Sequence, residues 1–428
     1  MGQPYHGTWP VDLQRGDFMA DGPLAGVRVF DLTVAEVGPW ASLNLGALGA
    51  DVIHIEPTPG ARGNDQRVFA RGGVLGERPM AGPNGIESWA VGYIAWNMNK
   101  RGITLDLKNE EDLAYAHELL KTCDVFVMNM RPGVADRLGV GYEAVSKLND
   151  QIVYCSVTGF GEDGPMVEVP GADPQIRYVT GFAEGTGVPG DMPQGYRFSG
   201  QIDATTGNYA AQSIMMALLA RKRTGKGQRV EITMLNAGTA LQSVRFGEYF
   251  ASGQRPELLG AYAQSTAPDG AWLCQDNRYL GVAVTNEDQW RAFCGVIKHL
   301  DLLEDPRFGT NADRVDHRDE LNVILAPIFQ STVVEYWELK FGQAGIPCSH
   351  VARWSELRHH DQVLTNEFLK QVDSPHFEHA WTGGPPYHLS ETPQRWFRTP
   401  GIGEHNDEVR EELPKVRAQR DGQSGKGS

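Results

Sequence analysis

Two apolar segments with a helical segment between them restrict the fold of this chain more than any other feature. Residues 26–32 (GVRVFDL) predict a strand, residues 40–48 predict a helix, and residues 50–56 (ADVIHIE) predict a second strand. A strand, a helix and a strand in such close succession form a βαβ unit, whose two strands are parallel. The start of the chain therefore predicts an α/β fold with a parallel sheet.

The same alternation returns further along the chain. Residues 110–122 predict another helix, and residues 124–129 (DVFVMN) and 151–160 (QIVYCSVTGF) predict two more strands. An amphipathic helix at 205–223 and a strand at 229–234 follow, joined by a glycine-containing turn. We therefore expect a parallel sheet with at least four strands.

Beyond these strands the pattern changes. Residues 235–251 predict a helix, and residues 259–346 predict a compact unit in which strands precede helices. Two long connections rich in Gly and Pro, 57–95 and 161–202, interrupt the regular elements. Irregular connections of this length tend to carry function, so both are candidate borders of a site.

The charge of the chain limits its partners. Its 39 Lys and Arg residues against 54 Asp and Glu residues give a net charge of −15, whereas binding to nucleic acid needs a basic surface. No apolar run reaches the ~18 residues of a membrane span, and the first residues lack the pattern of a signal peptide. Five cysteines without a CxxC pair favour reduced thiols. We expect a cytoplasmic protein that binds neither nucleic acid nor a membrane.

Glycine is unusually frequent, with 50 residues in 428, against about 7% in an average protein. The common nucleotide motifs do not explain it, because neither GxxxxGK[ST] nor a GxGxxG directly after a strand is present. The metal motif HExxH and the nucleophile motif GxSxG are also absent. The excess therefore indicates tight turns and close backbone approaches.

Two acidic residues in loops are the candidates for chemistry. Asp203 precedes the apolar helix and could simply be its N-cap. It could instead be a nucleophilic carboxylate that the helix dipole keeps ionised. Asp173 precedes Pro174 and fits an ordinary turn. Local composition favours the structural role for both residues, and no short motif connects them.

From Leu24 to about Leu413 the chain resembles the class III CoA-transferases, the group that contains formyl-CoA transferase, carnitine CoA-transferase and the acyl-CoA racemases. The matching stretches, in chain order, are LAGVRVFDLTVAEVGPWASLNLGALGADVIHIE, WNMNKRGITLDLK, DVFVMNMRPGVADRLGVGYE, VYCSVTGFGEDGP, RKRTGKGQRVEITM, DPRF, AGIPCSHV and GEHNDEV.

This resemblance implies a Rossmann-like large domain whose parallel sheet is built from N- and C-terminal segments, with a small α+β domain inserted between them. Two chains would interlock as rings in a homodimer, although a heteromer with a paralogous subunit stays open. The expected division is an N-terminal extension (1–23), the first part of the large domain (24–225), linker helices and the small domain (226–345), the C-terminal part of the large domain that wraps around the partner (346–417) and a disordered tail (418–428).

The resemblance also implies the chemistry. CoA would move from an acyl-CoA donor to a small carboxylic acid through an aspartyl-CoA thioester on Asp203, with Asp173 as a second acid and no metal. The residues that match the family's contacts with coenzyme A are Val34, Ala35, Glu36, Val37, Leu105, Lys108, Asn129, Met130 and Arg137. Lys108 and Arg137 would supply positive charge for the CoA phosphates.

Three residues depart from the family pattern. Pro57 stands where some members have Arg, and Gly260 is the sole glycine of LLGAYAQS, where formyl-CoA transferase has a multi-glycine lid. Ala172 stands where the racemases have His. Because racemisation needs two acid–base groups, Ala172 favours CoA transfer over the alternative of an acyl-CoA racemase. A CoA-binding subunit of a heteromeric transferase is the other alternative.

Overall fold

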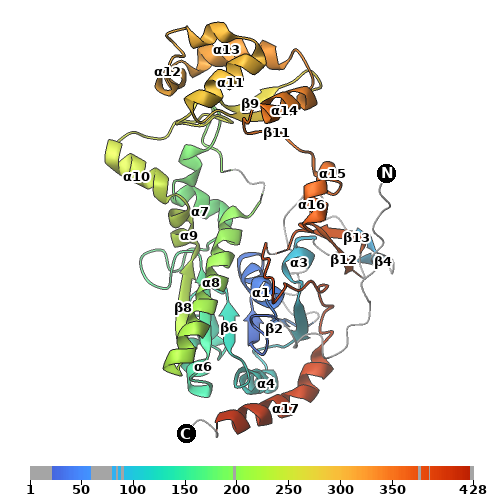
Figure 1. Ribbon diagram of the computed structural model, residues 1–428. Helices are drawn as coiled ribbons and strands as arrows, with labels where there is room; N and C mark the ends of the chain where they lie inside the picture. The colour runs from blue at the N-terminus through green and yellow to red at the C-terminus, as the bar shows by residue number, and fades with distance from the viewer. Residues whose placement is uncertain are drawn as a thin grey trace. The chain divides into compact units, whose positions relative to one another are not determined.

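The computed structural model describes residues 22–58, 80–82, 85–87, 91–195, 199–374, 377–384 and 386–424. The chain divides into two compact units, each with a core of its own (Figure 1). The first unit combines Met1–Thr180, Arg197–Ser243 and Glu367–Ser428, and the second combines Gly181–Tyr196 and Val244–Asn366. The domain boundaries expected from the sequence stay predictions.

A six-stranded sheet forms the centre of the first unit. All its neighbouring strands pair in parallel, which confirms the predicted α/β fold with a parallel sheet. Its described strands all lie between residues 28 and 233, and the C-terminal strands pair only with each other, so the expected contribution of C-terminal strands to this sheet is not observed. The strands in their order across the sheet are β5 (Lys100–Thr104), β2 (Asp51–Glu56), β1 (Arg28–Leu32), β6 (Val125–Met128), β7 (Val153–Thr158) and β8 (Gln228–Thr233). The sequence predicted every strand of this sheet except β5.

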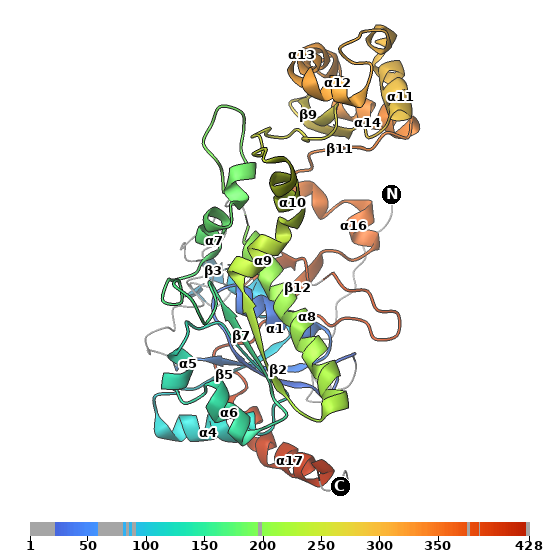
Figure 2. The same ribbon diagram turned by 90° about the vertical axis from the view of Figure 1, so that its left-hand side faces the viewer.

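Alternate residues of a strand point to opposite faces of the sheet. Every residue of β1, β2, β6 and β7 is buried, so these strands are covered on both faces. On one face Val29, Val125 and Val153 pack with helices α1 (Val37–Ala47) and α8 (Gln201–Thr224). On the other face Phe30, Phe126 and Tyr154 stack in a row across three strands. The helices that cover this second face are α4 (Glu110–Leu120), α6 (Tyr142–Leu148) and α17 (Asn406–Ser424) (Figure 2).

The strand order locates the place where a ligand can bind. From β1 the chain proceeds to β2 and β5 on one side and to β6, β7 and β8 on the other side. In open sheets of this kind, ligands bind beyond the carboxyl ends of the strands at the point where the order reverses. That point lies between β1 and β6, so the loops after these two strands border the expected site.

Helix α8 is longer at its start than the sequence predicted. It begins at Gln201 instead of residue 205 and ends at Thr224, followed by Gly225 in the left-handed conformation (φ +70°). Glycine is the residue that most readily caps a helix in this way. The single helix predicted at 235–251 is two helices, α9 (Met234–Leu241) and α10 (Ser243–Ser252).

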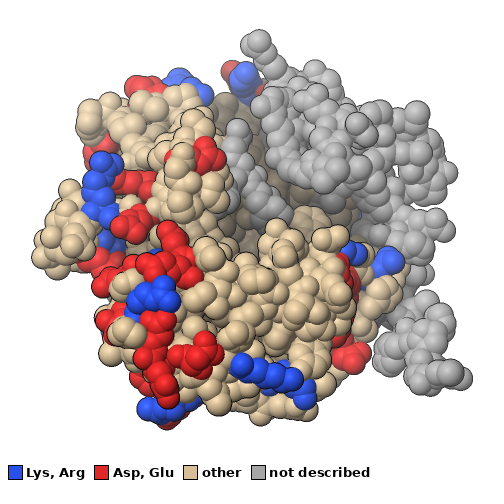
Figure 3. Space-filling model, turned by 90° about the horizontal axis from the view of Figure 1, so that it is seen from above, with Lys and Arg blue, Asp and Glu red and all other residues tan. Residues whose placement is uncertain are grey.

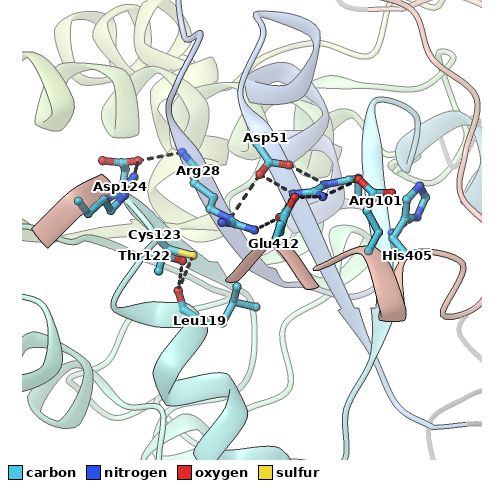
Figure 4. Close-up of polar contacts among 12 residues, drawn as sticks. Arg28, Asp51, Arg101, Leu119, Thr122, Cys123, Asp124, His405 and Glu412 are labelled. Atoms are coloured by element: carbon cyan, nitrogen blue, oxygen red, sulfur yellow. Dashed lines mark hydrogen bonds and ion pairs between the residues drawn. The ribbon is translucent and has the colours of Figure 1, made fainter. Parts of the chain in front are cut away.

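The C-terminal helix α17 is held against the sheet by buried charges (Figure 4). Arg101 of β5 donates to Asp51 of β2 at 2.6 Å and to Glu412 of α17 at 2.7 Å, and Arg28 of β1 pairs with both acids. Helix α17 continues to Ser424, into the stretch from residue 418 that the sequence predicted to be a tail.

The remaining elements of the first unit are short. Of the connection 57–95, only two strands, a helix and a few flanking residues are among the described residues. These elements, with those of the later connections, are β3 (Met80–Gly82), β4 (Gly85–Glu87), α3 (Val91–Trp96), α5 (Val134–Arg137), α7 (Asp173–Val179), β12 (Lys370–Ser374) and β13 (Phe377–Thr382).

The second unit has a small antiparallel sheet in the order β11–β10–β9. The strands expected early in the unit at 259–346 are β9 (Asp269–Leu273) and β10 (Tyr279–Ala283). Trp272, Phe293 and Phe329 pack in the core of this unit. The other elements are β11 (Cys348–His350), α11 (Glu287–Ile297), α12 (Asn311–Asp316), α13 (Arg318–Phe329), α14 (Val334–Gln343), α15 (Trp354–Leu357), α16 (Asp361–Thr365) and the 3₁₀ turns η1 (Phe182–Gly185) and η2 (Leu300–Leu303).

The surface agrees with the acidic composition. On the face in Figure 3, Asp and Glu side chains cover more of the coloured surface than Lys and Arg, whose patches are separate from one another. Among the helices that the structure describes, none is long and apolar enough to cross a bilayer. Within the same described ranges, no three His, Cys, Asp or Glu residues are grouped as metal ligands would be.

Candidate active site

One buried carboxylate, that of Asp31, holds the loop after β1 in place. Asp31 accepts hydrogen bonds from the Thr33 amide (3.1 Å) and the Ser42 hydroxyl (2.7 Å), and its Oδ2 lies 3.1 Å from His54 Nδ1 and 3.0 Å from Lys100 Nζ. Burial alone would raise the pKa of Asp31, but Lys100 and His54 hold this pKa well below its ordinary value. The carboxylate therefore stays ionised and anchors the loop.

The loops after β1 and β6 are joined where the strand order reverses. Asn129, directly after β6, accepts a hydrogen bond from the Val34 amide at 2.8 Å and donates one to the Val34 carbonyl at 2.7 Å. A Cβ on Gly38 would lie 2.5 Å from Thr33 Cβ and 3.0 Å from Asn129 Cγ, so this close approach requires glycine. Two of the predicted CoA contacts, Val34 and Asn129, therefore meet at the expected ligand-binding edge.

The first turn of α8 is capped by a residue from a distant segment. Asp173, the first residue of α7, accepts hydrogen bonds through Oδ2 from the amides of Ile202 (2.7 Å) and Asp203 (3.2 Å). Its Oδ1 pairs with Arg177 Nε, and Arg177 Nη2 donates to the Ser199 carbonyl. In most helices the side chain of the N-cap residue accepts hydrogen bonds from the first free amides. Gly200, the N-cap residue of α8, has no side chain, so Asp173 supplies the accepting oxygen instead.

Two glycines allow Asp173 to approach α8. A Cβ on Gly159, which follows β7, would lie 2.5 Å from the Cα of Gly171. A Cβ on Gly171 would lie 2.4 Å from the Cα of Gly159. Real Cβ atoms do not come this near to a backbone, so both positions need glycine. This contact brings the segment that begins α7 against the carboxyl end of the sheet.

Three carboxyl groups gather at the start of α8. Glu36, from the loop after β1, lies against Gly200, where an added Cβ would be 2.5 Å from the Glu36 carboxyl carbon. Burial, and then the charges of Asp203 and Asp173, raise the pKa of Glu36 to about 8, although Arg177 acts in the opposite direction. The site thus holds three acids near one arginine.

The pKa of the Asp203 carboxyl is also raised. Burial and the charge of Asp173 raise its pKa to about 7, and Arg177 partly offsets this. Among the described residues, the Asp203 carboxyl has no hydrogen-bond or ion-pair partner, and its side chain is half-buried. The raised pKa is opposite to the expectation that the helix dipole keeps Asp203 ionised. A carboxyl with a strongly perturbed pKa and no structural partner is a functional-site candidate, and in its ionised form it can act as a nucleophile.

One known protein family matches nearly the whole chain. The sequence profile described as CoA-transferase family III matches residues 24–406. The chain belongs to this family. It is an enzyme of the class III CoA-transferases, which confirms the resemblance seen in the sequence.

Relatives of known activity and a solved structure cover nearly the whole chain. The succinyl-CoA:glutarate CoA-transferase of Mus musculus is 31% identical, over 91% of this chain and 86% of that protein. The formyl-CoA:oxalate CoA-transferase of Streptomyces coelicolor is 30% identical, over 90% of this chain and 94% of that protein. A crystal structure of a CAIB/BAIF family protein from Brucella suis is 28% identical with a TM-score of 0.82, and covers 92% of this chain and 100% of that chain.

The other predicted CoA contacts of this family III chain differ in exposure. Lys108 and Arg137 are exposed, Met130 is half-buried, and Leu105 and Val37 are buried in the core. Ala35 is exposed and has a positive φ of 62°. Helix α5, which ends at Arg137, borders a hollow of about 200 Å³ whose lining includes Pro132, Gly133, Asp136, Tyr142, Glu162 and Arg229.

The buried thiols do not fit a catalytic role. Cys123 and Cys155 are fully buried, and burial raises the pKa of each thiol to about 12. A nucleophilic cysteine needs a lowered pKa and some exposure. Neither Cys123 nor Cys155 therefore fits the role of a nucleophile.

Sequence reasoning did not identify Arg177, Gly200 or the anchoring role of Asp31. Arg177 follows Asp173 by four residues, a spacing at which oppositely charged side chains pair on a helix, and this signal was available. The approach of Gly200 to Glu36 had no local signal, because 164 positions separate the two residues in the chain.

Proposed function

We propose that the chain transfers CoA between two carboxylic acids, with Asp203 as the covalent nucleophile. The observation that carries this proposal is the Asp203 carboxyl at the start of α8. It has no structural partner among the described residues, whereas both oxygens of neighbouring Asp173 are committed. An uncommitted carboxylate beside the ligand-binding edge of the sheet suits attack on a thioester.

The proposed reaction divides one exchange into simpler steps. Asp203 Oδ attacks the thioester carbonyl of the donor, and collapse of the oxyanion releases CoA thiolate and leaves a mixed anhydride on Asp203. The thiolate then attacks the Asp203 acyl carbon, which forms an aspartyl-CoA thioester and releases the donor acid. The acceptor carboxylate attacks this thioester and the same steps run in reverse, so that the acceptor leaves as its CoA ester and Asp203 is regenerated.

The residues at the carboxyl edge of the sheet fit a CoA substrate. Exposed Lys108 and Arg137 offer positive charge for its phosphates on an otherwise acidic protein. The loop after β1 is fixed by Asn129 through both main-chain groups of Val34, and it offers exposed Ala35 to the pantetheine arm. Leu105 is 4% exposed, so we expect it to act through its backbone or by supporting Lys108.

Asp173 supports the reaction without touching the substrate. Its Oδ2 accepts from two amides of α8 and its Oδ1 pairs with Arg177, so neither oxygen is free to orient an acceptor or to protonate a leaving group. We infer that Asp173 holds Asp203 in position.

We also propose that the enzyme is a homodimer with an inserted small domain, as the resemblance implies.

The names of the relatives suggest where to look for substrates. The two relatives above pair a CoA thioester with glutarate or oxalate as the other acid. We therefore propose a dicarboxylate as acceptor. Succinyl-, acetyl- and formyl-CoA, each tested against oxalate, succinate and glutarate, form the first panel.

Covalent trapping tests the proposal. Incubation with acyl-CoA followed by hydroxylamine should convert Asp203 to a hydroxamate, which peptide mass spectrometry detects. Asp203→Asn should abolish both this mark and CoA transfer while the protein keeps its melting temperature within a few degrees. Unchanged turnover in the variant would sink the assignment.

The same samples separate the alternatives. Exchange of the α-hydrogen of an acyl-CoA for deuterium without CoA transfer would indicate a racemase instead. CoA transfer by the pure, singly expressed chain would exclude a subunit that needs a paralogous partner.

A further inference from the structure

The backbone donors at the start of α8 are already occupied. Helix N-termini commonly supply the amides that stabilise a developing negative charge. Here the Gln201 amide donates to the Ser199 carbonyl (2.9 Å), and the Ala204 amide donates to the Gly200 carbonyl (2.8 Å). The two amides between them donate to Asp173. An oxyanion that forms at Asp203 therefore needs a donor from another element.

Among the side chains that the structure describes around Asp203, Glu36 on the loop after β1 is the candidate donor. Arg177 is committed to Asp173 and to the Ser199 carbonyl. Glu36 is half-buried against Gly200, and within the described residues its carboxyl forms no hydrogen bond and no ion pair. When it is protonated, such a carboxyl has an O–H to donate.

The surroundings of Glu36 favour the protonated form. Burial favours this form most, and among the described residues the charges that act on Glu36 are those of Asp203 of α8 and of Asp173 and Arg177 of α7. The pKa of Glu36 is raised to about 8 and that of Asp203 to about 7. Because the charge of an ionised Asp203 is itself one cause that raises the pKa of Glu36, the pair favours ionised Asp203 beside protonated Glu36. Between these values the pair is an anion beside an acid, an arrangement in which two carboxyl groups take different roles.

We propose that Glu36 is a further catalytic residue, a neutral acid whose O–H hydrogen-bonds the thioester oxygen as Asp203 attacks. The inference rests on the proposed role of Asp203. As the Asp203 Oδ–carbon bond forms, the C=O π electrons move onto the acyl oxygen, and Glu36 holds that oxyanion by its hydrogen bond. When the oxyanion collapses, CoA thiolate leaves and Glu36 keeps its proton, so the same group serves each acyl transfer.

The test is the pH dependence of the first covalent step. We would measure the single-turnover rate of CoA release from acyl-CoA between pH 6 and 9.5 for the wild type, Glu36→Gln and Glu36→Ala. The wild-type rate should rise through about pH 7 as Asp203 ionises and fall above about pH 8 as Glu36 loses its proton. Glu36→Ala should be roughly 10²–10³-fold slower, the usual cost of removing one oxyanion donor.

The glutamine variant separates a donor from a structural role. Its amide donates a hydrogen bond but does not titrate, so Glu36→Gln should recover most of the rate that Glu36→Ala loses and should lack the decline above pH 8. Exposed Glu411→Gln is the matched control and should keep the wild-type profile. A Glu36→Gln variant as slow as Glu36→Ala, or one that retains the decline, would overturn the proposal.

A spectroscopic readout keeps this inference separate from the role of Asp203. Infrared difference spectra of wild type minus Glu36→Gln at pH 7.5 should show the C=O band of a protonated carboxyl, and this band should vanish above pH 9. Absence of the band refutes the neutral acid whatever the nucleophile is. If the band is present but hydroxylamine never marks Asp203, the proposed nucleophile is wrong and the protonation of Glu36 stands.

Discussion

At the scale of single residues, Asp173 has a testable electrostatic effect on Asp203. Burial raises the pKa of Asp203 most, the negative charge of Asp173 raises it further, and Arg177 lowers it. Asp173→Asn removes the charge and frees Arg177, so the pKa of Asp203 should fall below about 7. The acid limb of the kcat/KM profile should move to lower pH, and loss of the charge-assisted cap should reduce stability by ~1–3 kcal/mol.

The pH profile of kcat/KM for Asp173→Asn shows whether Asp173 positions Asp203 or transfers a proton itself. If Asp173 protonated a leaving group, Asp173→Asn would abolish turnover at every pH instead of moving one limb. Asp163→Asn, at an exposed acid in the same connection, is the control and should change neither the profile nor the melting temperature.

The sequence predicted the acids of this site better than it predicted their partners. The resemblance singled out Asp203 and Asp173, which are brought together by hydrogen bonds that span 29 and 30 positions of the chain. Glu36 was predicted only as a CoA contact. Its raised pKa arises from burial and then from the charges of Asp203 and Asp173, and only the folded arrangement of the loops creates that environment.

At the scale of elements, the start of α8 and the loop after β1 are coupled through Gly200. An added methyl group at Gly200 would lie 2.5 Å from the Glu36 carboxyl carbon, and this carboxyl is the end of a flexible side chain that can swing away. Gly200→Ala should therefore displace Glu36 at little cost in stability. We expect a single-turnover rate that approaches that of Glu36→Ala, measured by CoA release.

A glycine with no neighbouring atoms where a side chain would begin is the control for the general effect of replacing glycine with alanine in this protein. Gly295 lies within α11 with no atom near its missing side chain. Gly295→Ala should leave the rate unchanged and stabilise the protein by about 0.5–1 kcal/mol, because alanine favours the helix. A Gly200→Ala variant with full activity would contradict the coupling of the two elements.

The element boundaries that the sequence missed have physical causes. Helix α8 begins at Gln201 because Asp173, from another segment, caps its first amides. Strand β5 was not predicted because it begins with Lys100 and Arg101, which are charged yet buried. Burial is possible there because each has an acidic partner, Asp31 and Asp51 respectively. The strongly apolar strands β1, β2, β6 and β7 lacked such features and were predicted correctly.

At the scale of the whole chain, a buried charge cluster connects the C-terminal helix with the first strands. Arg28, Asp51 and Arg101 of the sheet meet Glu412 of α17, and all four side chains are under 10% exposed (Figure 4). Sequence patterns could not show this contact, because its partners lie more than 300 positions apart. The cluster explains how a helix with a polar composition packs against the sheet.

Removal of Glu412 should therefore weaken the first unit as a whole. Glu412→Ala leaves two buried arginines with one acid fewer, and removal of one partner from a buried ion pair costs about 3–5 kcal/mol. Exposed Glu411→Ala, one position earlier on the same helix, should change stability by less than about 0.5 kcal/mol. Urea unfolding followed by circular dichroism measures both variants. Equal midpoints would show that the cluster does not hold α17, and the packing of Val409 and Leu413 against the sheet would then account for its position.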